Sequence, residues 1–377
     1  MSFELDRTLL DFSSKMAEPF CTVWELCCYR LVAPLDPEKF ENCTTRTREI
    51  AVRVFIGLGA VLGVFLLCAF PVPMLFRVVA LGIGVKLLRA IGFALQKGGF
   101  THVRGEAPEK TLNYSMKVMS WNICGVGGGL SLDHGGVVHW RSRVGALIEK
   151  VKKEEPDVLL LQEVYDTALG EALIDGLKKD YAHFFIHLGP NVMGSIGGCM
   201  ILSKCAVRDF SHTSFTNNHW TLNRGFETLE LKASPQDIWP SVRIIGTHLI
   251  HGDTSDAKNN RMEQVAQIVD SLRETMPTIL AGDLNIERDG EGKQLLEPFC
   301  HAYKGHEPTC TNELTAKWSS KERGVREETI DYISLFKKGG AYVRFEDCHL
   351  VKAFDESYNT KTALSDHHGL SVVVKGF

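Results

Sequence analysis

The hydrophobic and polar positions of this chain alternate in short runs from about residue 114 to the C-terminus. Apolar runs of about four to eight residues, separated by turn residues, are typical of β-strands. The predicted strands are 116–123, 157–164, 197–204, 225–231, 241–249, 277–285, 329–335 and 369–377. In two intervening stretches, 140–154 and 259–274, apolar residues recur every three or four positions, which predicts helices. We therefore expect an α/β (α+β) fold in which two packed sheets are flanked by helices.

A long apolar stretch precedes this region. Residues 54–76 carry no charge over 23 positions, and a membrane-spanning helix needs about 20 apolar residues. Two prolines separate this stretch from a second apolar one, in which Lys86 and Arg89 share one helical face. We predict an N-terminal helical membrane segment, a hairpin over 51–96 that crosses the bilayer once or twice or only re-enters it. A buried core helix is the alternative.

Positive charges flank the predicted hairpin on both sides. Arg46, Arg48 and Arg53 precede or begin it, and Lys97 and Arg104 follow it. Because positively charged flanks of membrane segments stay on the cytoplasmic side, both flanks are expected to be cytoplasmic. The predicted location is therefore a membrane, with the following domain facing the cytoplasm.

The remaining segments complete the predicted organisation. Residues 1–50 form a cytoplasmic, juxtamembrane segment, in which Cys27 and Cys28 are either palmitoylated or unmodified buried thiols. The polar stretch 97–113, which contains glycine and proline, is predicted to be a linker, and 114–377 is predicted to be a soluble domain. The chain has 11 cysteines, an odd number with no CxxC pair, which favours a reducing compartment.

The overall charge changes one expectation about partners. The chain has 42 Lys and Arg residues against 46 Asp and Glu residues, so its net charge is -4. Proteins that bind nucleic acid usually present a basic surface, and this composition offers no general excess of positive charge. A nucleic-acid partner is therefore disfavoured, although a local basic patch would still allow one.

Polar side chains stand at the trailing ends of several predicted strands. Asn122, Glu163 and His248 each end one strand, and Asp283 and Asn285 end another. Each residue alone is explained equally well as a turn former or a solvated strand end. Together they predict a single crevice, because active sites are commonly built where strands leave a rigid sheet.

Six short motifs follow one another along the soluble domain: SWNI, LLLQEV, GTHL, AGDLN, TIDYI and LSDHHG. This ordered series resembles the endonuclease/exonuclease/phosphatase superfamily, the deoxyribonuclease-I-like phosphodiesterases. The resemblance covers 114–377 and implies a four-layered α/β sandwich with the active site at one end of two facing sheets. The stretches LLLQEVYD, LNRGFETLEL and GTHLIHGDTSDAKNNRMEQVAQI are most similar to neutral sphingomyelinases, which also carry a hydrophobic pair ahead of the catalytic domain.

The resemblance implies a metal site. Glu163 is the expected main ligand, Asn122 lies beside it, and Asp366 is close to the metal. Oxygen ligands of this kind suit Mg²⁺, which keeps several waters and takes one or two carboxylates. Mn²⁺ is the alternative ion.

The resemblance also implies the catalytic groups. His367 is the expected general base, oriented by the carboxylate of Asp331. Asp283 and Asn285 are expected to orient the attacking water and the phosphate, and His248 to donate hydrogen bonds to the phosphate. His248 and Asn285 are thus the predicted substrate-binding residues as well.

Three functions remain open from the sequence. The leading one is a membrane-anchored, Mg²⁺-dependent phosphodiesterase that hydrolyses a phospholipid headgroup in the manner of a sphingomyelinase, with membrane lipid as both substrate and anchor. The second is a Mg²⁺-dependent endonuclease or exonuclease of the same superfamily. The third is a non-catalytic membrane scaffold, which is disfavoured because no expected catalytic position is lost. His368 has no predicted role beyond that of a structural histidine at the start of a strand.

Overall fold

The computed structural model describes most of the predicted soluble domain. The described residues are 12, 83–88, 90–92, 99–112, 114–126, 137, 139–189, 196–218, 223–232, 241–290, 292–311, 327–338, 343–355 and 362–376. Most of the predicted membrane hairpin and of the segment before it lies outside these ranges. The described parts of the hairpin, 83–88 and 90–92, are helical. Among the described residues, no helix combines the length and the hydropathy needed to cross a membrane.

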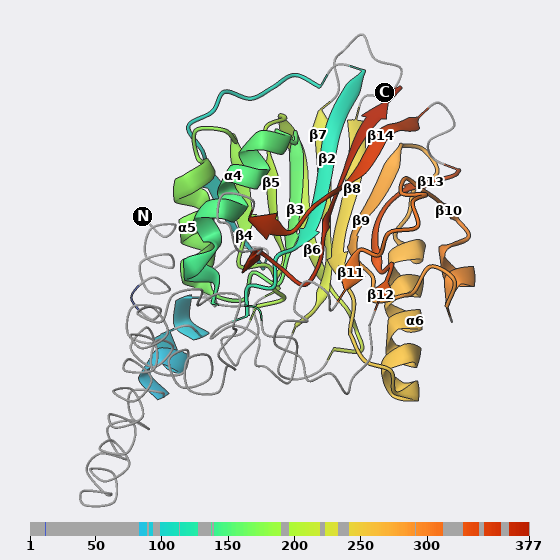
Figure 1. The fold of residues 1–377 in the computed structure, drawn as a ribbon, viewed down its shortest axis with the longest axis horizontal. Helices are drawn as coiled ribbons and strands as arrows, with labels where there is room; N and C mark the ends of the chain where they lie inside the picture. Colours follow the sequence, from blue (N-terminus) through green and yellow to red (C-terminus); the bar gives the residue numbers. More distant parts are fainter. Residues whose placement is uncertain are drawn as a thin grey trace, which may run out of the picture.

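Two mixed sheets face each other at the centre of the domain (Figure 1). The first sheet has the order β1-β4-β5-β3-β2-β17-β14, and the second has the order β10-β13-β9-β8-β7-β6. The strands of the first sheet are β1 (Thr101–Arg104), β2 (Ser115–Asn122), β3 (Val158–Gln162), β4 (His183–Ile186), β5 (Met200–Ser203), β14 (Arg344–Val351) and β17 (Gly369–Lys375). Those of the second sheet are β6 (Val207–Ser214), β7 (Gly225–Lys232), β8 (Ser241–His248), β9 (Thr278–Asp283), β10 (Phe299–His301) and β13 (Asp331–Phe336). Four short strands, β11 (Cys310–Thr311), β12 (Glu327–Glu328), β15 (Phe354–Asp355) and β16 (Thr362–Ala363), form two further pairs.

Helices cover the outer face of each sheet. The helices α4 (Val144–Glu154) and α5 (Thr167–Leu177) pack on the first sheet, and α6 (Ser255–Asp270) packs on the second. Two 3₁₀ turns, η4 (Trp140–Ser142) and η5 (Lys293–Leu296), lie beside them. The order helix, sheet, sheet, helix gives the four layers that the resemblance implies.

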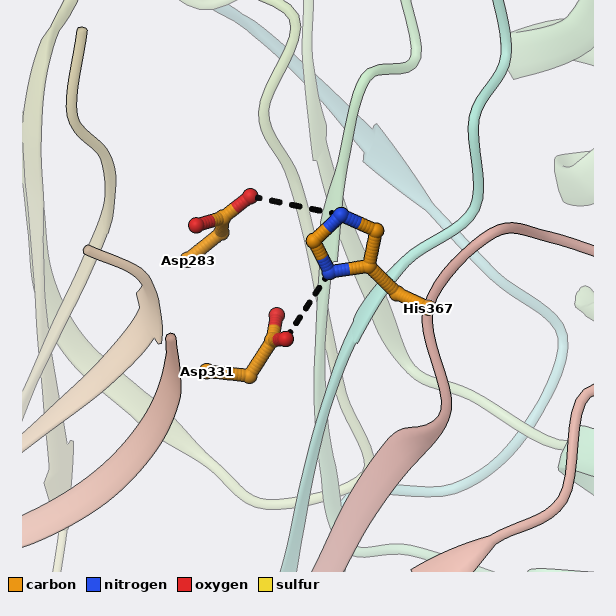
Figure 2. A group of neighbouring side chains, drawn as sticks. All are labelled: Asp283, Asp331 and His367. Atoms are coloured by element: carbon orange, nitrogen blue, oxygen red, sulfur yellow. Dashed lines mark hydrogen bonds and ion pairs between the residues drawn. The ribbon is translucent and has the colours of Figure 1, made fainter. Parts of the chain in front are cut away.

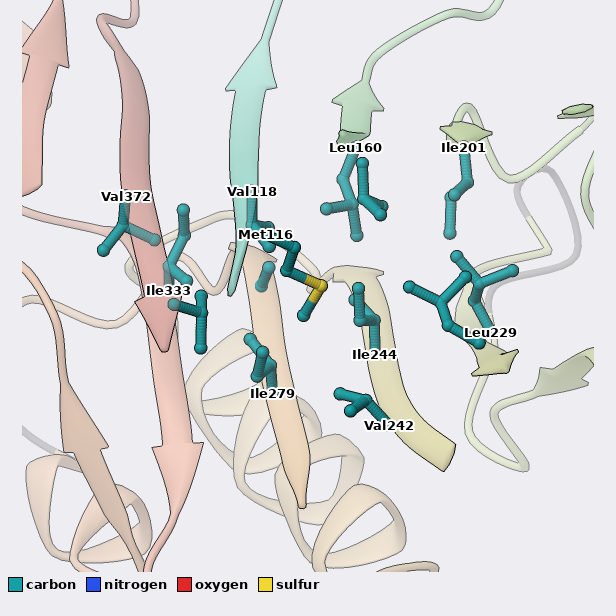
Figure 3. Close-up of a cluster of buried hydrophobic side chains, with 14 of the residues drawn as sticks. Met116, Val118, Leu160, Ile201, Leu229, Val242, Ile244, Ile279, Ile333 and Val372 are labelled. Carbon is teal, nitrogen blue, oxygen red and sulfur yellow. The ribbon is translucent and has the colours of Figure 1, made fainter. Parts of the chain in front are cut away.

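The main hydrophobic core lies between the two sheets (Figure 3). Val118, Leu160 and Ile201 of the first sheet pack against Ile244 and Ile279 of the second. Side chains alternate across a strand, so their neighbours in sequence point to the helices on the outer faces instead. Strands buried on both faces therefore read as continuous apolar runs. Burying each large aliphatic side chain contributes about 1.5–3 kcal/mol to folding.

The predicted strands and helices are confirmed with small shifts at their ends. All eight predicted strands are present, and the predicted helix 140–154 becomes η4 followed by α4. The predicted helix 259–274 begins earlier, at Ser255, because the side chain of Thr254 caps it by accepting a hydrogen bond from the Ala257 amide. Helix α5 and strands β4, β6, β10 and β14, which lie within the soluble domain, were not predicted.

The stretch 97–113, predicted to be a linker, contributes a strand to the first sheet. Residues 101–104 form β1, which pairs antiparallel with β4, and Gly189 donates a backbone hydrogen bond of 3.0 Å to Gly99. No apolar run marks this strand, because β1 is a short strand at the edge of the sheet. The described part of this stretch is thus part of the folded domain.

Candidate active site

The carboxyl ends of several strands meet at one end of the two sheets. In the first sheet, β2 and β3 run parallel, with Asn122 opposite Gln162. In the second, β8 and β9 run parallel, with His248 opposite Asp283. The antiparallel strand β13 begins at the same level, so Asp331 also lies opposite Asp283. Pairing within each sheet therefore brings these predicted site residues to the same end of the strands, as the sequence leads us to expect.

Asn122 joins the two sheets at this end of the strands. Its Nδ2 donates hydrogen bonds to Oε1 of Glu163 at 3.2 Å and to Oδ2 of Asp283 at 3.1 Å. Its Oδ1 accepts a hydrogen bond of 3.0 Å from the Cys124 amide. The side chain is buried, so this amide fixes two carboxylates from different sheets relative to each other.

His367 lies between two aspartates of the second sheet (Figure 2). Its Nδ1 is 2.8 Å from Oδ2 of Asp331, and its Nε2 is 3.9 Å from Oδ2 of Asp283. One ligand atom of each of the three residues lies within 4.8 Å of the others. The three side chains are buried. The structure thus brings together the three residues that the sequence places on two separate strands and a loop.

The loop that carries His367 is fixed by hydrogen bonds that involve Trp121 of β2, Ser365 of the loop itself and Arg143 at the start of α4. Trp121 Nε1 donates to the carbonyl oxygen of His367 at 2.9 Å. Ser365 Oγ donates to the carbonyl oxygen of Asn122 at 2.6 Å and accepts a hydrogen bond from the His367 amide at 3.2 Å. The buried guanidinium group of Arg143 donates to the carbonyl oxygens of Cys124 and Leu364. The loops before β17 and after β2 are therefore held as one unit.

His248 and Asn285 occupy the same end of the second sheet. His248 Nε2 is 3.5 Å from Oδ2 of Asp283, and its buried Nδ1 has no hydrogen-bond partner among the described residues. The Asn285 amide nitrogen of the backbone donates to Oδ1 of Asp283 at 2.9 Å, and its side-chain Nδ2 donates to the Leu249 carbonyl oxygen at 3.1 Å. Asn285 has φ +50° and Glu163 has φ +62°. Non-glycine residues with positive φ are uncommon and are concentrated at functional sites.

Burial and mutual repulsion govern the charges of these residues. Burial, followed by the negative charge of Asp331, raises the pKa of Asp283 to about 7. Burial lowers the pKa of His367, but the charge of Asp331 and the neighbouring Cys310 outweigh it, so this pKa is raised well above its usual range. The carboxylate of Asp331 therefore stabilises the form of His367 that has accepted a proton. Asp283, with a pKa near neutrality, is a second group next to the predicted base that is able to accept a proton.

The donor set fits a hard divalent cation. Burial and then the charge of Asp366 raise the pKa of Glu163, which means that the two carboxylates repel each other. Oδ1 of Asp331 is buried and has no hydrogen-bond partner among the described residues. A divalent cation relieves this repulsion, and carboxylate and amide oxygens are the ligands that Mg²⁺ prefers. Glu163 and Asp366, with Asn122 beside them, are the residues that would hold it.

Several residues of this site were not predicted from the sequence. They are Trp121, Arg143, Arg224, Cys310 and Ser365. Trp121 and Ser365 directly adjoin predicted residues in the motifs SWNI and LSDHHG, and Arg224 lies in the stretch LNRGFETLEL. For the other two the sequence offers no signal, because only the tertiary contacts bring them to the site.

His368 has a structural role, as predicted. Its Nδ1 accepts a hydrogen bond of 3.1 Å from the Ala353 amide, and its own amide donates to the Thr309 carbonyl oxygen at 2.7 Å. Burial, before any neighbouring charge, lowers the pKa of this imidazole to about 4. The ring is therefore neutral near pH 7 and acts as a hydrogen-bond acceptor at the start of β17.

Comparison with known proteins assigns the fold to a family. Residues 119–367 match the model of the Endonuclease/Exonuclease/phosphatase family. The chain belongs to this family. The match begins in β2 and ends at His367, so all eight predicted site residues of the Endonuclease/Exonuclease/phosphatase domain lie inside it.

The individual proteins that resemble this chain share a quarter of its residues or fewer over the aligned region. Sphingomyelinase C of Bacillus cereus is 25% identical over 302 residues, which cover 70% of this chain and 85% of that protein. The crystal structure of beta toxin from Staphylococcus aureus has a TM-score of 0.56 at 20% identity, covering 68% of this chain and 99% of the other. That of truncated TDP2 from Caenorhabditis elegans has a TM-score of 0.51 at 22% identity, covering 70% and 98%. These structures share the fold of the chain.

A pocket of about 430 Å³ opens beside Asn285. The start of α6 lines one part of it with Lys258 and Arg261, and Glu287 and Glu328 line another. The pocket is therefore polar and carries charges of both signs. Of the predicted site residues, only Asn285 lines it.

Proposed function

We propose that this chain is a divalent-metal-dependent phosphodiesterase that hydrolyses the headgroup of a phospholipid, as a sphingomyelinase does. The observation that carries the proposal is the hydrogen-bonded network in which Asn122 joins Glu163 to Asp283 and His367 pairs with Asp331. The 25% identity to sphingomyelinase C supports the lipid substrate.

The side chains of the network divide the chemistry of phosphodiester hydrolysis among them. Glu163, with Asn122 and Asp366, would hold Mg²⁺, or Mn²⁺ in its place, and the ion when bound would neutralise charge on the phosphate. The beta toxin of Staphylococcus aureus has a structure with bound magnesium ions, and its fold is similar to that of this chain.

The other groups act on the water and the phosphate. His367 and Asp283 together accept the proton of the attacking water, and Asp331 holds the imidazole ring in place. His248 and Asn285 contact the phosphate and stabilise the charge that develops on it. Each of these groups is fixed by hydrogen bonds or ion pairs to its neighbours, which favours positioning of the reacting atoms.

Membrane attachment is part of the proposal. The apolar segment 51–96 would hold the domain at the bilayer and raise the effective concentration of a lipid substrate. In the described part of this segment, Ile83, Leu87 and Ile91 are exposed and recur every four residues. This spacing places them on one side of a helix, where they are able to contact lipid.

The experiment is a substrate panel on the full chain. Purified protein in mixed micelles is assayed on choline, ethanolamine and inositol phospholipids and on single- and double-stranded DNA, with Mg²⁺, Mn²⁺ or EDTA. His367→Ala is the inactive control. We expect release of phosphorylated headgroup with Mg²⁺ and none with EDTA. Cleavage of DNA without any cleavage of lipid would overturn the lipid assignment, and metal-independent turnover would overturn the metal role.

A nuclease of the same family is the second candidate, and the family, which is described as including endonucleases and exonucleases, keeps it open. The net charge of -4 disfavours a nucleic-acid substrate. A non-catalytic membrane scaffold is the third candidate, and it predicts no turnover of any substrate in the panel. The eight intact site residues weigh against it.

A further inference from the structure

Arg224 is a buried arginine that the proposed chemistry leaves without a role. It directly precedes β7, and its side chain is nearly inaccessible to solvent, with 6% of the residue exposed. Its backbone is fixed, because its amide donates to Oδ1 of Asn218 at 2.9 Å and its carbonyl oxygen accepts from the Phe215 amide at 3.0 Å. A guanidinium group withdrawn from water is costly unless it is well hydrogen-bonded. The hydrogen-bond partners of the guanidinium group therefore indicate the role of Arg224.

The hydrogen bonds of the Arg224 guanidinium go to neutral oxygens. Nη1 donates to the carbonyl oxygen of His248 at 3.1 Å and to that of Leu249, and Nη2 donates to the hydroxyl group of Tyr165 at 3.3 Å. Within the described part of the chain, none of these acceptors is a carboxylate. Arg243, at the opposite end of β8, differs in this respect because it pairs with Glu230 at 2.8 Å.

Each acceptor belongs to a predicted site residue or to a residue one or two positions away from one. Tyr165 follows Glu163 by two positions at the end of β3, in the first sheet. His248 is itself a site residue at the end of β8, in the second sheet. The Leu249 carbonyl oxygen also accepts the hydrogen bond from Nδ2 of Asn285 at 3.1 Å. One guanidinium group thus connects the ends of β3 and β8, next to the predicted metal and phosphate ligands.

Tyr165 and the residue before it are held by contacts with Gly198. A Cβ atom at Gly198, which has φ +83°, would lie 2.3 Å from the Tyr165 ring, so the ring packs directly on that glycine. Tyr165 thus contacts Gly198 through its ring and Arg224 through its hydroxyl group. The amide of Val164 also donates to the Gly198 carbonyl oxygen at 2.7 Å, which fixes the residue between Glu163 and Tyr165.

We propose that Arg224 is a positioning residue of the phosphodiesterase site, which holds the ends of β3 and β8 at one separation so that Glu163, His248 and Asn285 keep a common geometry. The planar fork of arginine suits this task, because it presents several donors in fixed directions to three acceptors at once. A lysine at this position would keep the charge and lose the fork. The inference rests on the proposed function for its kinetic consequence and on the contacts alone for its structural one.

The test compares Arg224→Met and Arg224→Lys with the matched pair Arg243→Met and Arg243→Lys in the full chain. Both arginines are buried beside the second sheet, and only Arg224 contacts the site. We expect Arg224→Met to lower kcat about 100-fold with little change in KM, since small misplacements of reacting groups cost about this much. Arg224→Lys should recover only part of the loss. The Arg243 variants should lower the unfolding temperature and leave kcat within about twofold at a temperature where all variants are folded.

A second pair of measurements separates positioning from general destabilisation. Tyr165→Phe removes one acceptor, so its effect on kcat should be smaller than that of Arg224→Met and should largely disappear in the double variant. Amide hydrogen exchange, which needs no activity, should become faster at 163–166 and 248–250 in Arg224→Met and stay unchanged there in Arg243→Met. Unchanged exchange in these segments, or an equal loss of kcat in the Arg243 variants, would overturn the proposal. An inactive parent chain with the expected exchange pattern would instead overturn the proposed function alone.

Discussion

Nδ1 of His367 lies 2.8 Å from Oδ2 of Asp331, although the two residues belong to different sheets. Asp331 begins β13 in the second sheet, and His367 stands two residues before β17 in the first. The contact therefore exists only when the two sheets pack face to face. Any proton transfer at His367 depends on that packing as well as on the local sequence.

Asp331→Asn should keep the fold and lose most of the activity. The amide is almost the same size as the carboxylate, but it removes the negative charge that holds the imidazole of His367. We expect kcat to fall by about 100-fold or more, because a positioned general base contributes about 10²–10⁴-fold. Asp157→Asn, at the start of β3, is a control that removes another buried carboxylate away from the site. Equal kcat in Asp331→Asn and the parent would contradict the pairing.

Glu163→Gln should change the response to metal more than any other property. The substitution removes the charge of the proposed main ligand and keeps its shape. The Mg²⁺ concentration that gives half-maximal activity should rise by about tenfold or more, as measured by metal titration of variant and parent. Glu227→Gln removes the charge of a different glutamate, a buried one that contacts His212 at 3.1 Å. Its titration curve should match that of the parent, and a shift of equal size in both variants would count against Glu163 as the ligand.

Gly282→Ala should be among the most destabilising single substitutions. Gly282 has φ +148°, and a Cβ atom there would lie 1.9 Å from the Thr247 carbonyl oxygen on the neighbouring strand. We expect a loss of about 3–5 kcal/mol in the free energy of unfolding, measured with urea. Gly145→Ala is the matched control, because a Cβ atom in that helix meets no atom within 4 Å. It should stabilise the protein by about 0.5 kcal/mol, and a neutral Gly282→Ala would contradict the described packing.

Two partly buried histidines, His102 and His301, should each reduce the stability of the domain as the pH drops below about 6.5. Burial, followed by His183 and Arg104, lowers the pKa of His102 to about 4, and burial, followed by Lys304, Arg288 and Lys337, lowers that of His301 to about 4. Between the unfolded pKa near 6.5 and the folded pKa near 4, the unfolded chain binds more protons, so acid favours unfolding.

We expect these two histidines to account for about 2 kcal/mol between pH 7 and pH 5, after allowance for solvent screening. Urea unfolding at the two pH values, compared between the parent and a variant that lacks one histidine, measures their contribution, because Asp283, whose pKa is raised to about 7, acts in the opposite direction over this range. His102→Phe keeps the stacking on Phe185, whose ring centroid is 4.6 Å away, and removes one titrating group. This variant should lose part of the pH dependence; the full dependence in His102→Phe would rule out His102 as a source.

The sequence by itself determined eight strands and two helices of this protein, whereas helix α5 and several strands, the inner strand β4 among them, were not predicted. The apolar runs located eight strands and the 3.6-residue spacing located two helices, because burial on one or both faces imposes these patterns directly. Short polar edge strands such as β1 escaped prediction, since a strand with one unpaired edge needs no apolar run. The motifs also identified the eight polar residues, whereas the predicted membrane hairpin stays a prediction.

Only the tertiary structure decided how those residues meet. The sequence placed Asn122, Asp283 and His367 on three separate elements, and their mutual distances follow from the register of the strands and the packing of the sheets. The same packing brings Arg143 and Arg224 beneath the site. Contacts of this kind are long-range and depend on a few side chains, so they leave no periodic trace along the chain. The sequence shows which side chains are present, whereas their distances from one another depend on contacts between residues far apart in the chain.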